Sequence, residues 1–289
     1  MILFKRQAQL HDFLVRKKMN GNSVGFVPTM GALHEGHLSL IRKSKTENDI
    51  TLCSIYVNPT QFNDPRDLEK YPRPIDKDIE ILSSVECDIL FLPSTEEIYP
   101  DGMGKLKDYD LGPLENFLEG ASRPGHFRGV ANVVDRFLQI VQPDRLYLGQ
   151  KDFQQVKVIE KIVGSPDESG AVGKMKTEIR MCEIVREKDG LAMSSRNVRL
   201  SSSQRKNAAG ISRELFFIRD HWHEFDLETL KQQAIHRLNS IPEAQVDYLE
   251  FCDAASFQLV HGWKDAEHIV CVTAVKMGEV RLLDNVLLK

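Results

Sequence analysis

Short apolar runs alternate with amphipathic segments over the first two thirds of the chain, and this alternation leaves few possible folds. The apolar runs have the length and composition of buried strands and cover residues 24–27, 50–56, 89–92 and 145–148. Segments such as 38–45 and 76–84 follow the period of a helix. Strands that alternate with helices pair in parallel through crossover connections. We therefore predict an α/β fold with a Rossmann-like, doubly wound parallel sheet.

Beyond about Arg186 the pattern changes. Two helical segments precede three β-branched runs: residues 201–217 and 227–238, then 246–252, 268–274 and 280–283. Met277-Gly278-Glu279 predicts a turn between the last two strands. These features indicate a smaller C-terminal α+β domain with an antiparallel sheet. A chain of 289 residues suits two domains, which we place at 1–184 and 185–289. The polar segment 164–173, GSPDESGAVG, predicts a surface loop.

Charge and cysteine content exclude several classes of protein. The formal net charge of −4 argues against a nucleic-acid or anionic-membrane surface, which needs a basic excess. The five cysteines are far apart and mostly inside apolar runs, so we expect reduced core residues. No window approaches ~18 apolar residues, and Lys5 and Arg6 interrupt the N-terminus too early for a signal peptide. We expect a cytoplasmic protein with no nucleic-acid or membrane partner.

Two histidines follow the first apolar run, in the segment VPTMGALHEGH at residues 27–37. Gly31 permits an unusual turn, and a helix beginning near Glu35 would point its unpaired N–H groups outward from the sheet edge, where parallel sheets bind ligands. His34 and His37 are three residues apart and lie on one helix face, and a neutral imidazole can donate an N–H to a phosphate. The alternatives are ordinary core or exposed histidines and a zinc site. Zinc is the weaker of these, because HExxH requires spacing i, i+4.

A second motif, GQKDFQQ, covers residues 149–155 and follows another apolar run. Lys151 and Asp152, directly after a strand, suit the phosphate and ribose of a nucleotide. The alternative is that Asp152 simply caps the next helix.

A third motif, REKDGLAMSSRN, covers residues 186–197. The hydroxyls of Ser194 and Ser195 and the guanidinium of Arg196 form a compact donor set that could wrap a polyphosphate. The alternative is a polar loop leading into the helix that begins near Ser201.

Two further segments suggest binding. YVNPTQF at residues 56–62 follows a strand and offers amide side chains, which recognise hydroxyls and carboxylates without adding charge. RPGHFRG at residues 123–129 is basic and predicted to be a loop, as an active-site cover would be. Both also fit ordinary surface turns. The sequence contains no GxxxxGK[ST] phosphate loop, no GxGxxG after the first strand, no GxSxG elbow and no CxxC pair.

Taken together, these motifs resemble one family. The H-x-G-H turn and the later Met-Ser-Ser-Arg resemble the HIGH and KMSKS signatures of the nucleotidyltransferase superfamily. Within it, PTMGALHEGH, YVNPTQF, RPGHFRGV, GQKDFQQ and DGLAMSSRN, in this order, resemble the pantoate–beta-alanine ligase family. The resemblance runs from about Val24 to Arg199, and the C-terminal Leu-Asp-Asn at residues 283–285 fits as well.

The resemblance implies ATP-dependent condensation of pantoate with beta-alanine to pantothenate, AMP and diphosphate through a bound pantoyl adenylate. It also implies a homodimer, with Mg²⁺ held by the ATP phosphates and no metal ligand assigned to a protein side chain. The C-terminal domain would close over ATP as a lid. The alternative is another adenylyl- or cytidylyltransferase of the superfamily, whose phosphorylated acceptor would need cationic residues in place of Gln61 and Gln155. An aminoacyl-tRNA synthetase is disfavoured because a basic tRNA-binding appendage is missing.

The same resemblance implies roles for individual residues. Catalytic roles fall to His34, His37, Lys151 and Arg196, with His37 as proton donor. The residues expected to contact ATP are Met30, Gly31, Ala32, Leu33, His34, Glu35, Gly36, His37, Gly149, Gln150, Lys151, Asp152, Val185, Met193, Ser194, Ser195 and Arg196. Pantoate would contact Gln61 and Gln155, with Gln61 also near beta-alanine and Asn58 close by. Gln150 replaces a frequent glutamate of the family and should keep its backbone role, whereas Cys182-Glu183 departs from a more apolar pair just before Val185.

Overall fold

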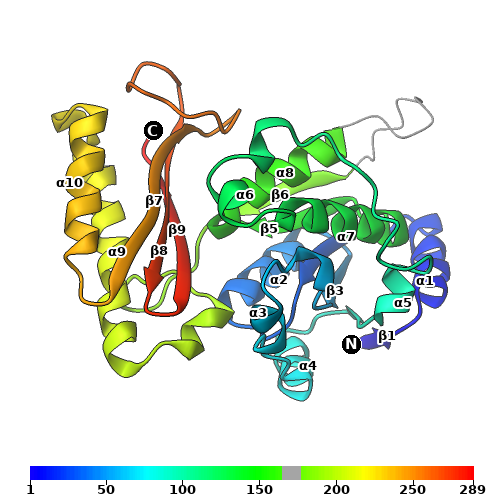
Figure 1. Cartoon of the computed structure of the whole chain (residues 1–289). Helices are drawn as coiled ribbons and strands as arrows, with labels where there is room; N and C mark the ends of the chain where they lie inside the picture. The colour runs from blue at the N-terminus through cyan, green and yellow to red at the C-terminus, as the bar shows by residue number, and fades with distance from the viewer. Residues whose placement is uncertain (165–176) are drawn as a thin grey trace. The chain divides into compact units, whose positions relative to one another are not determined.

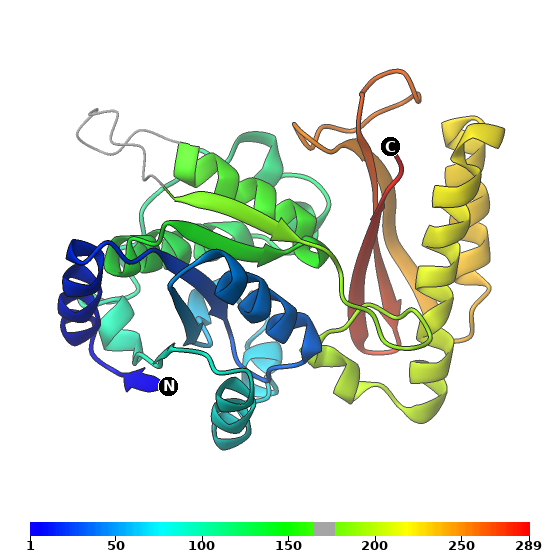
Figure 2. The ribbon, with the colours of Figure 1, turned by 180° about the vertical axis from the view of Figure 1, so that it is seen from behind.

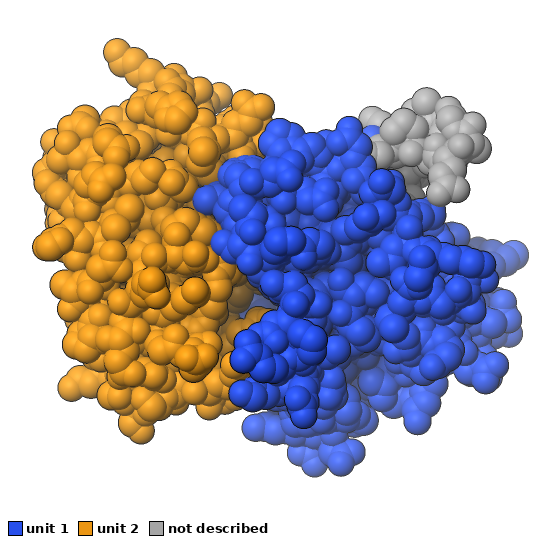
Figure 3. All heavy atoms as spheres, in the orientation of Figure 1, with its two compact units in different colours: residues 1–149, 154–182 blue, residues 150–153, 183–289 orange. Residues whose placement is uncertain are grey.

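The computed structural model describes residues 1–164 and 177–289. It divides into two compact units: unit 1 comprises residues 1–149 and 154–182, and unit 2 comprises residues 150–153 and 183–289 (Figure 3). Apart from Gly164, which ends a helix, the loop predicted at residues 164–173 lies outside the described residues.

Unit 1 is built on a six-stranded sheet in which every pairing is parallel. The strands are β1 (Ile2–Phe4), β2 (Val24–Thr29), β3 (Ile50–Ile55), β4 (Ile89–Phe91), β5 (Arg145–Gly149) and β6 (Glu178–Cys182), in the order β1-β4-β3-β2-β5-β6. The order reverses between β2 and β5, which confirms the predicted doubly wound α/β fold. Ligands of such sheets bind beyond the strand ends at the reversal point, and the predicted HEGH turn follows β2 directly.

Alternate residues of the central strands pack into two separate cores. Phe26 and Leu52 belong to a core with residues of α1 (Gln7–Met19), α7 (His126–Val141) and α8 (Phe153–Gly164). Their neighbours Val27 and Cys53 belong to a second core with residues of α2 (Glu35–Glu47) and α4 (Ile75–Ser84). Because successive side chains of a strand point to opposite faces, helices cover both faces of the sheet (Figure 1 and Figure 2). The shorter elements are η1 (Pro59–Gln61), α3 (Pro65–Glu69), α5 (Thr95–Ile98), η2 (Gly112–Glu115) and α6 (Glu119–Ser122).

The structure corrects one prediction in this unit. Residues 126–129, predicted to be a loop, form the first turn of the 16-residue helix α7. His126, Phe127 and Gly129 are buried there. The helix begins after Gly125, whose φ of +79° requires a conformation that glycine adopts without strain. This segment is therefore part of the framework of unit 1 and not an exposed cover.

Unit 2 contains an antiparallel three-stranded sheet, as predicted: β7 (Ala244–Asp253), β8 (Ile269–Met277) and β9 (Val280–Leu287). Helices α9 (Ser202–His221) and α10 (Leu227–Asn239) pack against the sheet and share one apolar core with it. Gly278, with φ of +57°, forms the predicted turn between β8 and β9. The remaining elements are the 3₁₀ helices η3 (Gln150–Asp152), η4 (Ser195–Arg199) and η5 (Trp222–Glu224).

The five cysteines are all free, as expected, and four of them are buried. Burial raises the pKa of Cys87 to about 11, so this thiol stays protonated and unreactive at neutral pH. In the parts of the chain that the structure describes, none of the helices has the length and apolar character needed to cross a membrane.

Candidate active site

The HEGH turn begins where β2 ends. Thr29 ties the strand end to the turn, because its hydroxyl donates to the Ser54 carbonyl at 2.7 Å and accepts from the Gly31 N–H at 3.1 Å. Gly31 and Ala32 both have positive φ, of +81° and +48°. These two residues form a turn between the end of β2 at Thr29 and the start of α2 at Glu35, which confirms the predicted strand–turn–helix arrangement.

The two histidines cap the start of α2 reciprocally. Nδ1 of His34 accepts from the Gly36 N–H at 3.1 Å, and Nδ1 of His37 accepts from the His34 N–H at 3.3 Å. The ring centroids are 4.0 Å apart. A backbone N–H can only donate, so each neutral ring must carry its proton on Nε2. The arrangement therefore fixes both rings as Nε2–H donors at the positive end of a helix dipole, a site that favours anions.

Asp78 of α4 holds this turn, and the sequence predictions missed it. Its carboxylate accepts from the N–H of Ala32 at 2.9 Å and of Leu33 at 2.8 Å, and its side chain is almost fully buried. Burial raises the pKa of this carboxyl, while the two N–H groups oppose the shift. The available signal was an acidic residue on the apolar stripe of α4, between Ile75 and Leu82.

A second cluster in unit 1 joins the YVNPTQF segment to the histidine turn. Nδ2 of Asn58 donates to Oε1 of Gln61 at 3.3 Å and to the Gly129 carbonyl at 3.1 Å. Nε2 of Gln61 lies 2.7 Å from Sδ of Met30. Asn58 and Gln61 are 1% and 8% exposed, so both amides are held in place by packing. The structure thus brings together Met30, Asn58 and Gln61, which sequence reasoning had assigned to two ligands.

Arg123 and His126 support the backbone of Gln61. Nδ1 of His126 donates to the Gln61 carbonyl at 2.7 Å, and Nη1 of Arg123 donates to Nε2 of the same ring at 3.0 Å. Arginine can only donate, so His126 is the neutral Nδ1–H tautomer. The RPGHFRG segment therefore acts on the candidate site by fixing Gln61.

Replacing Gly129 by alanine is expected to destabilise unit 1 by about 1–3 kcal/mol. A Cβ at this position would lie 2.2 Å from the Thr60 carbonyl oxygen, so α7 and the Asn58–Gln61 segment would have to separate. Urea unfolding monitored by circular dichroism measures the change. Gly104→Ala is the matched control, because a Cβ there meets no atom within 4 Å. Equal stability of the two variants would contradict the close approach.

The remaining predicted residues of the GQKDFQQ motif fall in different units. Gly149 ends β5 in unit 1, and Gln155 lies half-buried on α8 in the same unit. Lys151 and Asp152 belong to η3 in unit 2, where Nζ of Lys151 lies 3.1 Å from Oδ1 of Asp152. The side chains are 20% and 42% exposed, so this ion pair is partly accessible to a ligand.

The REKDGLAMSSRN motif forms a short hairpin in unit 2. Arg186 pairs with Ala192 in an antiparallel bridge, and the Met193 N–H donates to the Val185 carbonyl at 3.0 Å. Val185 and Met193, both predicted to contact ATP, are therefore neighbours. Ser194 then caps η4, its hydroxyl accepting from the Arg196 N–H at 3.3 Å. Ser195 and Arg196 lie in the first turn of this 3₁₀ helix and are half-buried.

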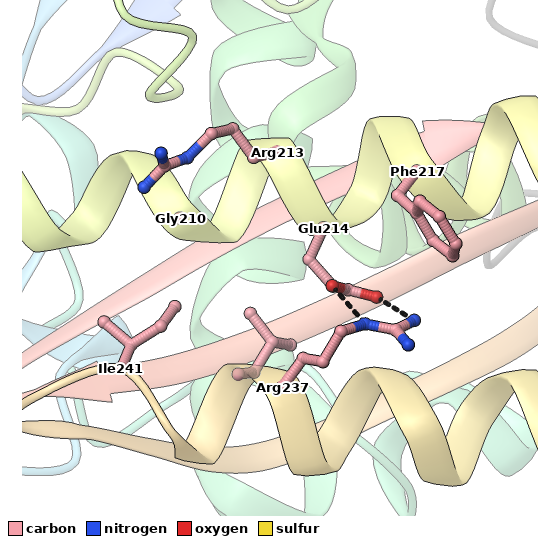
Figure 4. A pocket seen from close by; sticks show the side chains of 7 residues that line it. Gly210, Arg213, Glu214, Phe217, Arg237 and Ile241 are labelled. Atoms are coloured by element: carbon pink, nitrogen blue, oxygen red, sulfur yellow. Dashed lines mark hydrogen bonds and ion pairs between the residues drawn. The ribbon is translucent and has the colours of Figure 1, made fainter.

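A hollow of about 300 Å³ lies elsewhere in unit 2 and includes none of the predicted residues (Figure 4). It is lined by Gly210, Arg213, Glu214, Phe217, Arg237, Leu238 and Ile241. Arg237 donates to both carboxylate oxygens of Glu214, at 2.8 and 2.7 Å, and lies 4.7 Å from the Phe217 ring centroid. The charges of Arg237 and Glu214 neutralise each other, and we assign no function to the hollow. Residues 1–164 and 177–289 contain no group of three His, Cys, Asp or Glu side chains placed to hold a metal ion.

One protein family matches nearly the whole length of the chain. The family model for pantoate-beta-alanine ligase matches residues 2–287. Pantothenate synthetase from Porphyromonas gingivalis is 43% identical over 286 residues, covering 99% of each chain. That from Bacteroides thetaiotaomicron is 43% identical over 273 residues, 94% of each chain.

Solved structures give the same result. The crystal structure of pantothenate synthetase from Thermus thermophilus superposes with a TM-score of 0.88 at 37% identity and covers 99% of both chains. Pantoate-beta-alanine ligase from Francisella tularensis, solved in complex with beta-gamma ATP and beta-alanine, gives a TM-score of 0.80 at 39% identity, covering 99% of this chain and 97% of that one. With a full-length family match, sequence identities of 43% and this agreement in fold, the chain belongs to the pantoate–beta-alanine ligase family.

Proposed function

We propose that this protein condenses pantoate with beta-alanine at the expense of ATP. In the first step a carboxylate oxygen of pantoate attacks the α-phosphorus of ATP and diphosphate leaves, giving pantoyl adenylate. In the second step the amine of beta-alanine attacks the acyl carbon and loses a proton, and AMP leaves with the electron pair of the acyl–oxygen bond. The observation that carries the proposal is the histidine turn, where two Nε2–H donors are fixed at a helix N-terminus directly after β2.

Neither step needs a nucleophile from the protein, so catalysis rests on positioning and on stabilising the charge that develops on the phosphates. We assign this task to His34 and His37 in unit 1 and to Lys151, Ser194, Ser195 and Arg196 in unit 2. The cationic and hydroxyl donors of the second group suit phosphate oxygens. Asp152 suits the ribose, and Val185, beside Met193, suits the adenine.

Gln61, Gln155 and Asn58 are assigned to the substrates. Gln61 and Asn58 are buried amides that offer donors and acceptors without a charge, which fits a hydroxy acid whose carboxylate must remain nucleophilic. A nucleotidyltransferase that acts on a phosphorylated acceptor would need cationic side chains in place of Gln61 and Gln155. The neutral amides found there therefore favour pantoate over a phosphorylated acceptor.

Mg²⁺ is proposed to arrive with the ATP phosphates, as it does in sites where phosphate oxygens and water supply most of its ligands. Bound there, it would neutralise charge on the departing diphosphate. We further propose that the protein is cytoplasmic, because its cysteines are free and mostly buried, and that it is a homodimer, as the resemblance implies.

The test is a set of reactions in which each substrate is omitted in turn. With ATP and Mg²⁺, exchange of labelled diphosphate into ATP is expected to require pantoate and not beta-alanine, whereas AMP release is expected to require both. Exchange that proceeds without pantoate would refute the assignment. ATP binding with no diphosphate exchange under any condition would instead identify a catalytically silent nucleotide-binding protein.

A further inference from the structure

The C-terminal Leu-Asp-Asn motif, at residues 283–285 of β9, has no part in the function described so far. Asp284 and Asn285 are each 2% exposed, which is unusual for polar residues near the end of a chain. Buried polar groups are costly unless their hydrogen bonds are satisfied. The partners of these two residues therefore indicate what the motif does.

The Asn285 side chain bonds to the segment that carries Lys151. Its Nδ2 donates to the carbonyls of Gln150 at 2.9 Å and Lys151 at 3.1 Å. Carbonyl oxygens only accept, so this contact fixes the orientation of the amide and directs its Oδ1 to the Gln150 side chain, which donates at 3.0 Å. Two hydrogen bonds donated by one buried side chain thus hold the backbone carbonyls on either side of the Lys151 amide nitrogen, and a third, accepted by the same side chain, holds the Gln150 side chain.

Asp284 in turn fixes Asn285 and links it to the REKDGLAMSSRN hairpin. Arg186 donates to both oxygens of Asp284, at 2.7 and 2.8 Å, and to the Asn285 carbonyl at 3.3 Å. Oδ1 of Asp284 also accepts from the Asn285 N–H at 2.7 Å. Arg186 donates further to the Gly190 carbonyl at 3.0 Å, in the turn of the hairpin. One buried network therefore joins the two segments of unit 2 that are proposed to serve the nucleotide.

We infer that Asn285 is a positioning residue for the adenylation step: it sets the backbone from which Lys151 reaches the phosphates, and the Arg186–Asp284 pair holds Asn285 for this purpose. The inference rests on the proposed function. A lysine side chain is flexible, so the place of its ammonium group depends on how firmly its backbone is held. A displacement of the order of 1 Å at a reacting group lowers rates by up to about 10²-fold.

The experiment compares the two half-reactions in Asn285→Ala. Diphosphate exchange, which involves the triphosphate, is expected to slow about tenfold. Conversion of preformed pantoyl adenylate and beta-alanine to pantothenate does not involve the triphosphate and is expected to be unchanged. Asn239→Ala is the matched control: this asparagine of unit 2 also bonds a backbone group, accepting from the Val246 N–H at 2.8 Å, in a part of the unit remote in sequence from both nucleotide segments. If Asn285→Ala slows both half-reactions to the same extent, the role of Asn285 is only structural and the inference is wrong.

A double-mutant cycle with Lys151→Ala supplies the second criterion. If Asn285 acts through Lys151, Asn285→Ala should slow diphosphate exchange by less than about twofold in the Lys151→Ala background. Additive losses would overturn the inference.

If Asn285→Ala does not fold, the same two half-reactions are measured with Asn285→Ser, whose hydroxyl keeps one hydrogen-bond donor. If Lys151→Ala alone leaves exchange unchanged, the assignment of Lys151 in the proposed function is wrong. If only Asn285→Ala is without effect, the proposed function stands and this inference fails.

Discussion

Replacing His37 by alanine is expected to slow diphosphate exchange by roughly 10²- to 10⁴-fold, the usual contribution of a positioned proton donor. The Nε2–H of His37 is held in one tautomer by the His34 N–H, so it can donate to a phosphate oxygen as charge develops there, without reorganisation. Initial rates of exchange at saturating pantoate, measured across ATP concentrations, separate a loss in kcat from a loss in ATP binding.

The same substitution removes a helix cap, and this effect must be separated from catalysis. Loss of the capping bond should cost about 0.5–2 kcal/mol of stability. His37→Gln can restore that bond, because glutamine at the third position of a helix accepts from the N-cap N–H, and it should recover stability without recovering rate. Asp226→Ala is the matched control, since it removes an N-cap bond to Thr229 at the start of α10. If His37→Gln and wild type exchange diphosphate equally fast, His37 is only a cap.

The interior strands could be predicted from sequence because each is buried on both faces. β3 is buried at all six positions, and its sequence, Ile-Thr-Leu-Cys-Ser-Ile, is a short, mainly apolar run rich in β-branched residues, which favours a buried strand. The edge strands β1 and β6 gave no such signal. β1 has only three residues, of which Ile2 and Leu3 are 48% and 41% exposed, and β6 alternates polar with apolar residues, so neither segment contains an apolar run of the length seen in the interior strands.

The first turn of α7 was missed for a local reason. Thirteen of the sixteen residues of α7 are buried, yet polar residues recur at helical spacing along it, at Arg128, Asn132, Asp135 and Gln139. Gly125 and Gly129 gave the first turn the appearance of a loop, although Gly129 is required by the close approach of Thr60. Tertiary packing, which the sequence does not display, decides the structure here.

Within the candidate site, the residues that carry a local motif could be identified, and the residues that hold them could not. His34, His37 and Lys151 stand directly after strands, where ligands of parallel sheets bind. Asp78 binds backbone N–H groups that lie 45 and 46 residues away along the chain. Asn285 binds backbone carbonyls that lie 134 and 135 residues away. Backbone N–H and carbonyl groups are the same in every residue, so nothing in the sequence marks which ones a distant side chain will bind.

Among the residues that hold the motifs in place, Asp78 is expected to have the largest effect on the rate. Asp78→Asn is expected to slow diphosphate exchange by about 10²-fold, because the turn that presents His34 and His37 loses one of its two acceptors. The carboxylate uses a separate oxygen for each N–H, whereas asparagine supplies one oxygen and turns an NH₂ toward the other. An unsatisfied buried donor should also cost about 1–3 kcal/mol of stability. Asp76→Asn, in the first turn of the same helix, is the matched control.

The pH dependence of stability tests the same contact independently. Burial raises the pKa of Asp78, so the folded chain binds this proton more tightly than the unfolded chain does. The carboxyl therefore contributes stability below its unfolded pKa and loses that contribution as the pH rises through its folded pKa. The side chain at this position in the Asp78→Asn variant cannot titrate. The difference in unfolding free energy between wild type and variant should therefore narrow as the pH rises from about 4, near the pKa of the unfolded carboxyl, toward neutral. A difference that widens over this range would mean that the two N–H groups of the turn, and not burial, control the carboxyl.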